Sequence, residues 1–384
     1  MSKEIDAPEV EKELEKDETK DVTIPPEEFN AEMELCKRNP HKYIMDWMEG
    51  NLLFVGSKVM RLLALQPGSL ILPNIPFMSS AIKTPFNILI IAPPSGGKSS
   101  ISKKYLQITY HPYEIRKVSE PQLVDDLYSK EIFTLVLEDF SQIGNDYEVI
   151  KVIEGALGDE QKVMKRNKRQ VLEKNVVGVG LICGTWSDLS RYLEYFKAGF
   201  LFRNNIMFID LTGEQKRKIG KYINDGIGNK TGIESSLKKQ FVVKKYYDKL
   251  YNLMSEGKTQ VKDYHLDKKL KDELYEVWAR AVKQYNELDF NFSRELQEGY
   301  RITITSAFLN VFNRKLKDGI LFPESEDFEL GKSLMIENLN NKVALLKSKM
   351  LQNLSAKELK IMIEKASIPP RTKKILENLM KHKV

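Results

Sequence analysis

Residues 87–101, NILIIAPPSGGKSSI, constrain the fold of this chain more than any other stretch. The first five residues are mostly apolar and rich in isoleucine, which is typical of a strand buried on both faces of a parallel sheet. A loop of small and rigid residues follows, and a helix is predicted to begin at Lys98. From Phe86 to Asp210 four or five apolar runs alternate with helical patterns, which indicates an α/β parallel sheet.

The loop between this strand and helix has the composition of a phosphate cradle. Gly96 and Gly97 let backbone N–H groups turn inward where a Cβ would intrude. The helix start adds unpaired N–H groups, Lys98 adds a positive charge, and Ser99 offers a hydroxyl to Mg²⁺. The spacing Ala92-x-x-x-x-Gly97-Lys98-Ser99 fits the P-loop pattern, with Ala in place of the first Gly. An ordinary glycine turn before a helix is the alternative. The predicted nucleotide-binding residues are Pro94, Ser95, Gly96, Gly97, Lys98, Ser99 and Ser100.

Two carboxylates follow a second apolar strand, IFTLVL, about forty residues after Lys98. In the usual Walker B arrangement an Asp holds the water shell of magnesium, and a following Glu activates the attacking water. Here the order is reversed, as Glu138-Asp139, so we assign the pair jointly to metal and base. With Ser99 they form the predicted metal site. The alternative is two acids that begin a loop.

Two more polar residues stand at the ends of later apolar runs. Thr185 follows the run VVGVGLICG, and ligands of doubly wound sheets lie outside the carboxyl ends of strands. Thr185 is therefore predicted to orient the water or the γ-phosphate, although a helix-capping role is an equal alternative. Arg203 stands just before the run 206–211 and is predicted to reach the phosphates of a neighbouring subunit. The alternative for Arg203 is a solvated surface arginine.

The segment QKVMKRNKRQVLE, residues 161–173, is strongly basic. Alternation through Val163 and Val171, with Asn167 at the tip, predicts a β-hairpin. A basic hairpin on the ligand side of the sheet would meet a phosphate backbone, whereas the alternative is a solvated charged loop. The predicted nucleic-acid contacts of this segment are Lys162, Lys165, Arg166, Lys168 and Arg169.

The order of these motifs resembles the AAA+ ATPases, and more specifically the ATPase module of minichromosome maintenance (MCM) helicases and related viral or plasmid replication ATPases. The resemblance covers about residues 50–350. It implies ATP and Mg²⁺ as ligands, a homo-oligomer in the form of a ring, and single- or double-stranded DNA as partner. By resemblance Arg203 in LFRNN would be an arginine finger, and Arg301, opening a lid helix in EGYRITITSAFLNVFNRKLK, would be the sensor arginine.

The predicted catalytic set is Lys98, Glu138, Asp139, Thr185, Arg203 and Arg301. This chain departs from the family pattern in the reversed acids, in Thr185 where Asn is common, and in Asn204 where Phe is expected. The fold class predicted is α/β, a P-loop NTPase (AAA+-like) parallel sheet with a helical lid and a small C-terminal helical unit, for which a winged-helix domain is one interpretation.

Composition divides the chain into segments. Residues 1–30 carry eleven acidic residues against four lysines, although the whole chain has a net charge of +6. A basic body with an acidic tail suggests a polyanionic partner. The predicted segments are an acidic disordered tail, a helical N-terminal segment, a P-loop ATPase core, a helical lid region without strands and a C-terminal unit. Their bounds are 1–27, 28–85, 86–211, 212–350 and 351–384.

The C-terminal unit has a helix, a Pro-Pro turn and a second helix that opens with basic residues. It resembles a truncated helix-turn-helix, whose second helix would enter a DNA groove, and a helical hairpin that docks on a partner is the alternative. The predicted DNA contacts there are Arg371, Lys373 and Lys374.

Several classes of protein are disfavoured by composition. Two cysteines, Cys36 and Cys183, and four scattered histidines argue against a disulfide framework or a Cys/His metal site. No apolar stretch approaches the length of a membrane span, so a cytoplasmic protein with no membrane partner is expected. We expect a DNA-associated replication ATPase or helicase; a packaging or translocating motor and a nucleotide-switched DNA-binding regulator with little turnover are the alternatives. A small-molecule kinase would leave Arg203 and Arg301 without a role.

Overall fold

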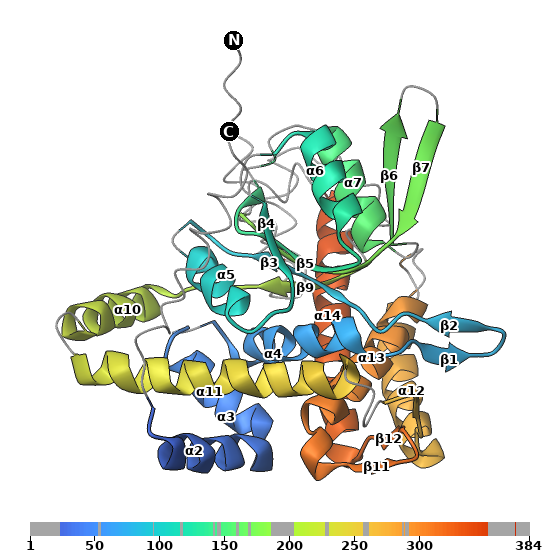
Figure 1. Ribbon diagram of the computed structural model, residues 1–384. Coiled ribbons are helices and arrows are strands. Elements are labelled where there is room, and N and C mark those ends of the chain that lie inside the picture. The colour runs from blue at the N-terminus through green and yellow to red at the C-terminus, as the bar shows by residue number, and fades with distance from the viewer. Residues whose placement is uncertain are drawn as a thin grey trace.

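A five-stranded parallel sheet forms the centre of the computed structural model (Figure 1). The structure describes residues 24–52, 55–94, 96–115, 118–140, 143, 147–158, 161–167, 170–185, 203–226, 230–255, 261–285, 288, 292–351 and 373. The strands lie in the order β4 (Pro112–Ile115), β5 (Ile132–Leu137), β8 (Val177–Gly184), β3 (Asn87–Ile91) and β9 (Asn204–Phe208). The α/β parallel sheet predicted between residues 86 and 211 is therefore confirmed.

Strand β3 is the first strand along the chain to join this sheet. It lies inside the sheet, and the strand that follows it in the chain is not its neighbour. It pairs with β8 on one side and β9 on the other, while the next strand, β4, forms the far edge. This order differs from the two common doubly wound orders, in which the first and second strands are neighbours. Because β8 lies between β5 and β3, residues at its carboxyl end separate the acidic pair from the predicted P-loop.

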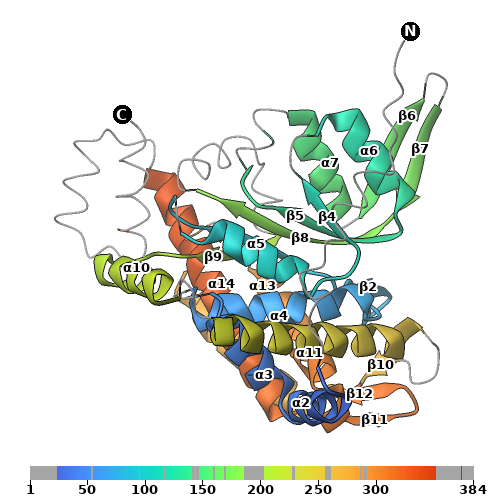
Figure 2. The same cartoon turned by 60° about the vertical axis from the view of Figure 1, so that its left-hand side comes forward.

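Helices cover both faces of the sheet (Figure 2). One face packs on α4 (Ser57–Ile71), α5 (Lys98–Leu106) and α11 (Lys230–Ser255), and the other on α6 (Glu120–Ser129) and α7 (Tyr147–Leu157). Close packing of α7 requires glycine in β8, because a Cβ on Gly180 would lie 2.4 Å from Leu157 Cδ1. The alternating small residues of β8 thus let a helix approach the sheet.

The N-terminal segment is helical, as predicted, but its last helix runs further than expected. The helices are α2 (Pro26–Arg38), α3 (Pro40–Glu49) and α4, which continues through Pro67 to Ile71 although Pro67 and Gly68 favour a break there. Contacts with the sheet explain the difference, because Gln66 Nε2 donates to Phe86 O at 2.7 Å and to Gly180 O at 2.9 Å. The segment predicted to be helical also contains a hairpin, β1 (Ile75–Phe77) with β2 (Ser80–Ile82).

The C-terminal region is mainly helical, but the prediction that strands stop after Leu211 is wrong. The helices are α10 (Gly213–Gly226), α11, α12 (Lys268–Lys283), α13 (Ser293–Leu309), the 3₁₀ turn η2 (Val311–Asn313) and α14 (Ser325–Leu351). A small sheet joins β10 (Asp263–Tyr264), β12 (Ile320–Phe322) and β11 (Lys315–Lys317). Its hairpin turns at Asp318-Gly319, both with positive φ, which is the Asp-Gly signal of a two-residue turn.

Helix α14 is fastened to the edge strand β9 by two asparagines. Asn338 Oδ1 accepts from Ile206 N at 2.9 Å, and Asn341 Nδ2 donates to Ile206 O at 2.6 Å. A buried ion pair, Lys342 with Glu295 at 2.7 Å, joins α14 to α13. These contacts satisfy the backbone of an edge strand that another chain would otherwise pair with. None of the described helices has the length and apolarity needed to cross a membrane.

We predict that folding stability depends on pH through His41. Its Nε2 lies 3.0 Å from Ser306 Oγ, and burial lowers the pKa of His41 to about 4, with Asp327 raising it and Arg61 and Arg314 lowering it. The imidazole is therefore neutral in the folded chain, whereas in the unfolded chain it gains a proton as pH falls below about 6.5. Stability should fall by up to about 1.4 kcal/mol per pH unit between these two pKa values. Urea unfolding of the wild type and of His41→Gln at several pH values would isolate this slope, and equal slopes in both would contradict the prediction.

Candidate nucleotide-binding site

The loop after β3 has the backbone geometry that its two glycines predict. Gly96 N donates to Pro93 O at 2.9 Å, and a Cβ on Gly96 would lie 2.7 Å from that same oxygen. Gly97 has φ +84°, in the left-handed region that glycine adopts without strain. The turn is therefore closed to residues with a side chain at Gly96 and strained for them at Gly97.

Helix α5 begins at Lys98, as predicted, with Gly97 as its N-cap. Glycine has no side chain to cap the helix, so the first N–H groups of α5 keep their capacity to bind an anion. The hydroxyl-bearing residues Ser99 and Ser100 are exposed on the first turn. Pro94 is exposed on the loop, and Ser95 lies outside the described residues.

The acidic pair lies beside the lysine of the loop. Glu138 and Asp139 follow the buried strand β5 directly, and both are half-buried. Lys98 is only 8% exposed, and its Nζ lies 3.6 Å from Asp139 Oδ2. A buried ammonium needs a compensating negative charge, and Asp139 supplies part of it within the chain.

Thr185 lies between the loop and the acidic pair because it follows the intervening strand β8. Ile91 is paired with Gly184, and Ala92 N donates to Gly184 O at 3.0 Å, so the two strand ends leave the sheet together. Thr185 itself is half-buried. The structure thus gathers Lys98, Ser99, Glu138, Asp139 and Thr185 at the carboxyl edge of the sheet.

The donor set at this edge suits a magnesium ion that a phosphate helps to hold. The described part of the chain contains no group of three or more His, Cys, Asp or Glu side chains able to bind a metal unaided. Magnesium bound with nucleotides takes one or two carboxylates, a hydroxyl and several waters, with the remaining oxygens from phosphate. Ser99, Glu138 and Asp139 match that requirement.

Arg203 and Arg301 lie at the opposite, amino edge of the sheet. Arg203 immediately precedes β9, as predicted, and Asn204 is paired with Asn87 at the start of β3. Arg301 Nε donates to Lys83 O at 2.7 Å, just before β3. The prediction that Arg301 opens a helix is wrong, because α13 begins at Ser293, eight residues earlier. The five residues of β3 separate the two edges, about 17 Å at 3.3 Å per residue.

The two arginines share a cavity of about 390 Å³. Arg203 approaches the end of α7, where a Cβ on Gly158 would lie 3.4 Å from Arg203 Nη1, and the carbonyl end of a helix attracts a cation. Lys83 and Arg294 also line the cavity, with Glu298 as its acidic member. Sequence reasoning missed Lys83 and Arg294, which belong to no local motif and meet the others only through the fold.

A buried polar network connects this cavity to the sheet. Glu298, 3% exposed, forms an ion pair with Arg301 and accepts from Asn205 Nδ2 at 3.2 Å. Asn205 Nδ2 also donates to Asn87 O, and the Asn87 side chain bonds to Leu157 O and Gly180 N. The Arg301 side chain is therefore held in place by groups that also position the start of β3.

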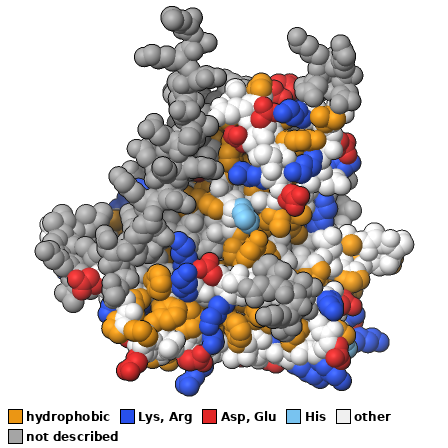
Figure 3. Space-filling model, viewed as in Figure 1, with side chains coloured by type: hydrophobic (Ala, Val, Ile, Leu, Met, Phe, Trp, Pro, Cys, Tyr) orange, Lys and Arg blue, Asp and Glu red, His pale blue; other side chains and the backbone are white. Residues whose placement is uncertain are grey.

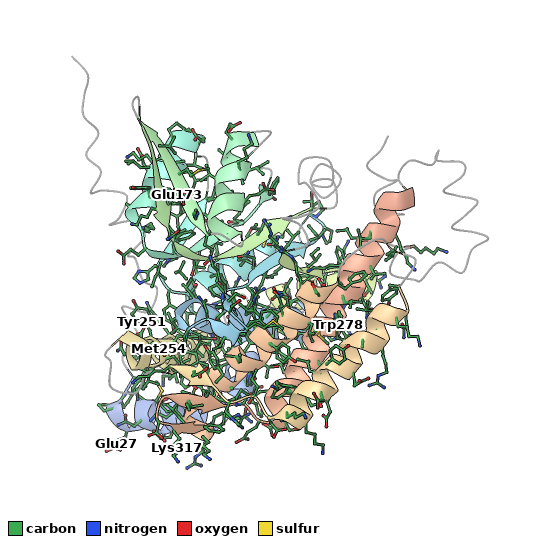
Figure 4. All side chains as sticks on the ribbon, turned by 90° about the vertical axis from the view of Figure 1, so that its right-hand side faces the viewer. Glu27, Glu173, Tyr251, Met254, Trp278 and Lys317 are labelled. Atoms are coloured by element: carbon green, nitrogen blue, oxygen red, sulfur yellow. The ribbon has the colours of Figure 1, made fainter. Side chains whose placement is uncertain are left out.

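The predicted basic hairpin is present as β6 (Lys162–Asn167) and β7 (Gln170–Asn175) (Figure 4, Glu173 labelled on β7). Asn167 pairs with Gln170, so Asn167 is the last paired residue of β6 and not the turn residue that the sequence predicts. Val163 is buried, while Met164 and Val171 are 56% and 60% exposed.

The described lysines of the hairpin have different surroundings. Lys165 lies 2.8 Å from Asp125 Oδ1 on α6 and 5.9 Å from the centre of the Tyr128 ring, which fits a side chain turned toward the sheet domain. Lys162 is half-buried and pairs with Glu173 at 2.6 Å across the hairpin. Arg166 is paired with Val171 in the strand register. Lys165 is thus engaged within the chain.

Other predicted nucleic-acid residues lie outside the described part of the chain. These are Lys168, Arg169, Arg371 and Lys374, together with almost all of the C-terminal unit and residues 1–23 of the acidic tail. Lys373 is described and exposed.

Comparison with known proteins identifies no family for this chain. No protein-family model matches the chain, and no curated protein matches it.

We predict that Arg301 and Glu298 are coupled energetically. Arg301→Ala leaves a buried carboxylate without its cation, which should lower the free energy of unfolding by about 2–4 kcal/mol. Adding Glu298→Gln should recover at least about 1 kcal/mol relative to additivity. Chemical denaturation of the two single variants and the double variant measures this coupling.

The exposed Arg280→Ala on α12 is the matched control, with an expected change within about 0.5 kcal/mol. If the effects of Arg301→Ala and Glu298→Gln on the free energy of unfolding were strictly additive, the ion pair would contribute nothing specific to the fold.

Proposed function

We propose that this chain is an ATP-hydrolysing, oligomeric ATPase associated with DNA, of the replication-ATPase or helicase type. One observation carries the proposal: a glycine loop, a buried lysine and two carboxylates come together at the carboxyl edge of the sheet, with Lys98 Nζ 3.6 Å from Asp139. The resemblance of the motif order to AAA+ ATPases supports it.

The residues at this edge fit ATP together with Mg²⁺. When bound, ATP supplies the phosphoryl group that is transferred to water. The N–H groups of Gly97 and of the first turn of α5 would bind phosphate oxygens. Glycine at position 96 leaves room in the turn, because a side chain there would fill it. Lys98 would balance the negative charge of the β- and γ-phosphates. Ser99 and one carboxylate would hold the metal, the other carboxylate would take the proton from the attacking water, and Thr185 would orient that water.

Arg203 and Arg301 lie at the other edge, so we infer that they serve the site of a neighbouring copy. A cation that approaches the transferred phosphoryl group stabilises the charge of the transition state, and it is often supplied by another protein chain. The position of the two arginines on one cavity favours a shared task. This arrangement requires a homo-oligomer, for which a ring is the closed form.

The β6–β7 hairpin is the proposed DNA contact. Exposed Met164 and Val171 place apolar surface between its basic positions, a combination suited to backbone phosphates and the bases or sugars beside them. On the face seen in Figure 3, basic side chains are interspersed with acidic and apolar ones and form no single continuous patch. The proposed DNA contact is therefore the hairpin and not a continuous basic surface on this face.

Two alternatives differ from this proposal in the nucleic-acid track and in the amount of ATP turnover. A packaging or translocating ATPase would use the same site with a different nucleic-acid track. A nucleotide-switched regulator with little turnover is favoured by the reversed Glu138-Asp139 order, which places the shorter acid beside Lys98. Measured ATP turnover with and without DNA separates a motor from a switch.

We predict that Lys98→Met abolishes ATP binding while leaving the fold intact. Methionine fills a similar volume without a buried charge, so the free energy of unfolding should stay within about 1 kcal/mol of the wild type or rise. Affinity for ATP should fall by about 100-fold or more, because the phosphate charge loses its main counterion. Calorimetry and thermal denaturation of the same preparation measure both quantities, and wild-type ATP affinity in this variant would refute the site.

Subunit mixing tests the inferred role of Arg203 in the same experiment series. Arg203→Ala and Lys98→Met oligomers should each be inactive, whereas mixtures should regain turnover, because interfaces that join an intact Lys98 to an intact Arg203 form again. Normal turnover by Arg203→Ala alone would exclude the role in a neighbouring site.

We predict that neutralising the hairpin weakens DNA binding without removing basal ATP hydrolysis. Replacing Arg166, Lys168 and Arg169 by Gln should lower the slope of log affinity against log salt by up to about 0.9 for each duplex phosphate that the variant no longer neutralises. Lys165→Gln is the matched control, with affinity close to that of the wild type, because Asp125 already engages that lysine. An unchanged salt slope in the threefold variant would place the DNA contact elsewhere.

A further inference from the structure

The β1–β2 hairpin carries an exposed apolar tip. Phe77 pairs with Ser80, so the strands are joined by the two-residue turn Met78-Ser79. Met78 is 94% exposed and Phe77 is 47% exposed. Figure 1 shows the hairpin projecting sideways beyond the helices around it. A large apolar side chain at a projecting tip contributes almost nothing to the core of its own chain.

The backbone at this tip is unfavourable for the residue it carries. Met78 has φ +50°, in the left-handed region, at the first central position of a two-residue hairpin turn. Glycine is the residue preferred there. Neither local conformation nor core packing explains a residue that is both strained and exposed, so such a residue indicates a functional role.

Contacts at the base hold the hairpin in a fixed direction. Ile75 is 5% exposed, and Pro73 O accepts hydrogen bonds from Thr84 Oγ1 and, at 2.6 Å, from Tyr264 Oη. These bonds come from both flanks of the hairpin, since Thr84 follows β2 and Tyr264 belongs to β10. A rigid apolar projection loses little conformational entropy when it binds, which favours association.

The hairpin belongs to the same face as the arginine cavity. Phe77, Ser80, Ala81 and Ile82 line that cavity together with Lys83, Arg203, Arg294 and Arg301. The cavity at the amino edge holds these four basic residues against one acidic residue, Glu298, while the carboxyl edge carries Glu138 and Asp139 together with Lys98. In the proposed ATPase a bound nucleotide adds negative charge at the carboxyl edge, which favours head-to-tail contact with the basic edge of the next copy.

We propose that the β1–β2 tip docks on a second copy of this chain, with Met78 and Phe77 buried beside the neighbour's carboxyl edge. The inference rests on the proposed function, because that function requires the basic edge of one copy to meet the nucleotide site of the next. It adds the element that would hold the two copies in register. The complementary charges alone do not define a register, whereas a projecting apolar side chain that becomes buried against the neighbouring copy does.

The first test compares the assembly of a tip variant with that of a control variant. Phe77→Ser/Met78→Ser should weaken self-association at least tenfold by sedimentation, with and without a non-hydrolysable ATP analogue. Met164→Ser/Val171→Ser, which removes exposed apolar side chains from the other hairpin, should assemble as the wild type does. A tip variant that assembles normally, or a wild type that is monomeric in every condition, would overturn the proposal.

Nucleotide binding separates this inference from the proposed function. The dissociated tip variant should bind the ATP analogue within about twofold of the wild type, because the cradle belongs to one copy. Absence of binding by the wild type would refute the ATPase, while the sedimentation comparison would still decide the role of the tip.

A second test measures the environment of the tip directly. Both native cysteines, Cys36 and Cys183, are buried, so a solvatochromic dye on Met78→Cys labels this position selectively. Its emission should shift to shorter wavelength as protein concentration rises through assembly, whereas the same dye on Met164→Cys should not change. A dye at position 78 that stays in water within the assembled protein would overturn the proposal.

Discussion

The placement of β3 inside the sheet is the constraint on which both sites of this protein depend. The strand is buried along all five residues, with hydrogen-bonded neighbours on both sides. The glycine loop of the candidate site follows its carboxyl end directly, and the segment that carries Lys83 precedes its amino end. Each end of one short strand thus becomes part of a separate charged cluster.

The buried polar network at the start of β3 explains how a helical region can be part of the same structural unit as the sheet. Asn87 bonds across to β8 and α7, and Asn205 joins β3 to Glu298 on α13. On the outer edge, Asn338 and Asn341 of α14 satisfy the backbone of β9. Side-chain amides are suited to this position, because each offers both a donor and an acceptor to a strand with a neighbour on one side only.

Sequence reasoning succeeded where a few adjacent residues determine the structure. The strand and turn of 87–98 and the hairpin of 162–175 follow from local glycine content and alternation, and the structure contains both. It failed where distant residues decide the outcome: α4 continues through Pro67 because Gln66 bonds to Gly180, 114 residues away. The cavity that Arg203 and Arg301 share could not be predicted for the same reason. The two residues are 98 positions apart, and no pattern along the chain indicates that they meet. The Asp318-Gly319 turn is visible in the sequence, but its flanking strands are only three residues long.

The reversed acidic pair gains a physical meaning from the geometry of Lys98. Successive residues at the end of a strand point to opposite sides, so Glu138 and Asp139 are not interchangeable in space. The contact of 3.6 Å identifies Asp139 as the carboxylate on the lysine side of the cradle. An incoming phosphate would compete with Asp139 for Lys98, and a metal ion would give that carboxylate a new partner at the same moment. In the proposed ATPase, ligand binding would therefore release an ion pair within the chain, with Asp139 as the proposed metal ligand and Glu138 as the proposed base.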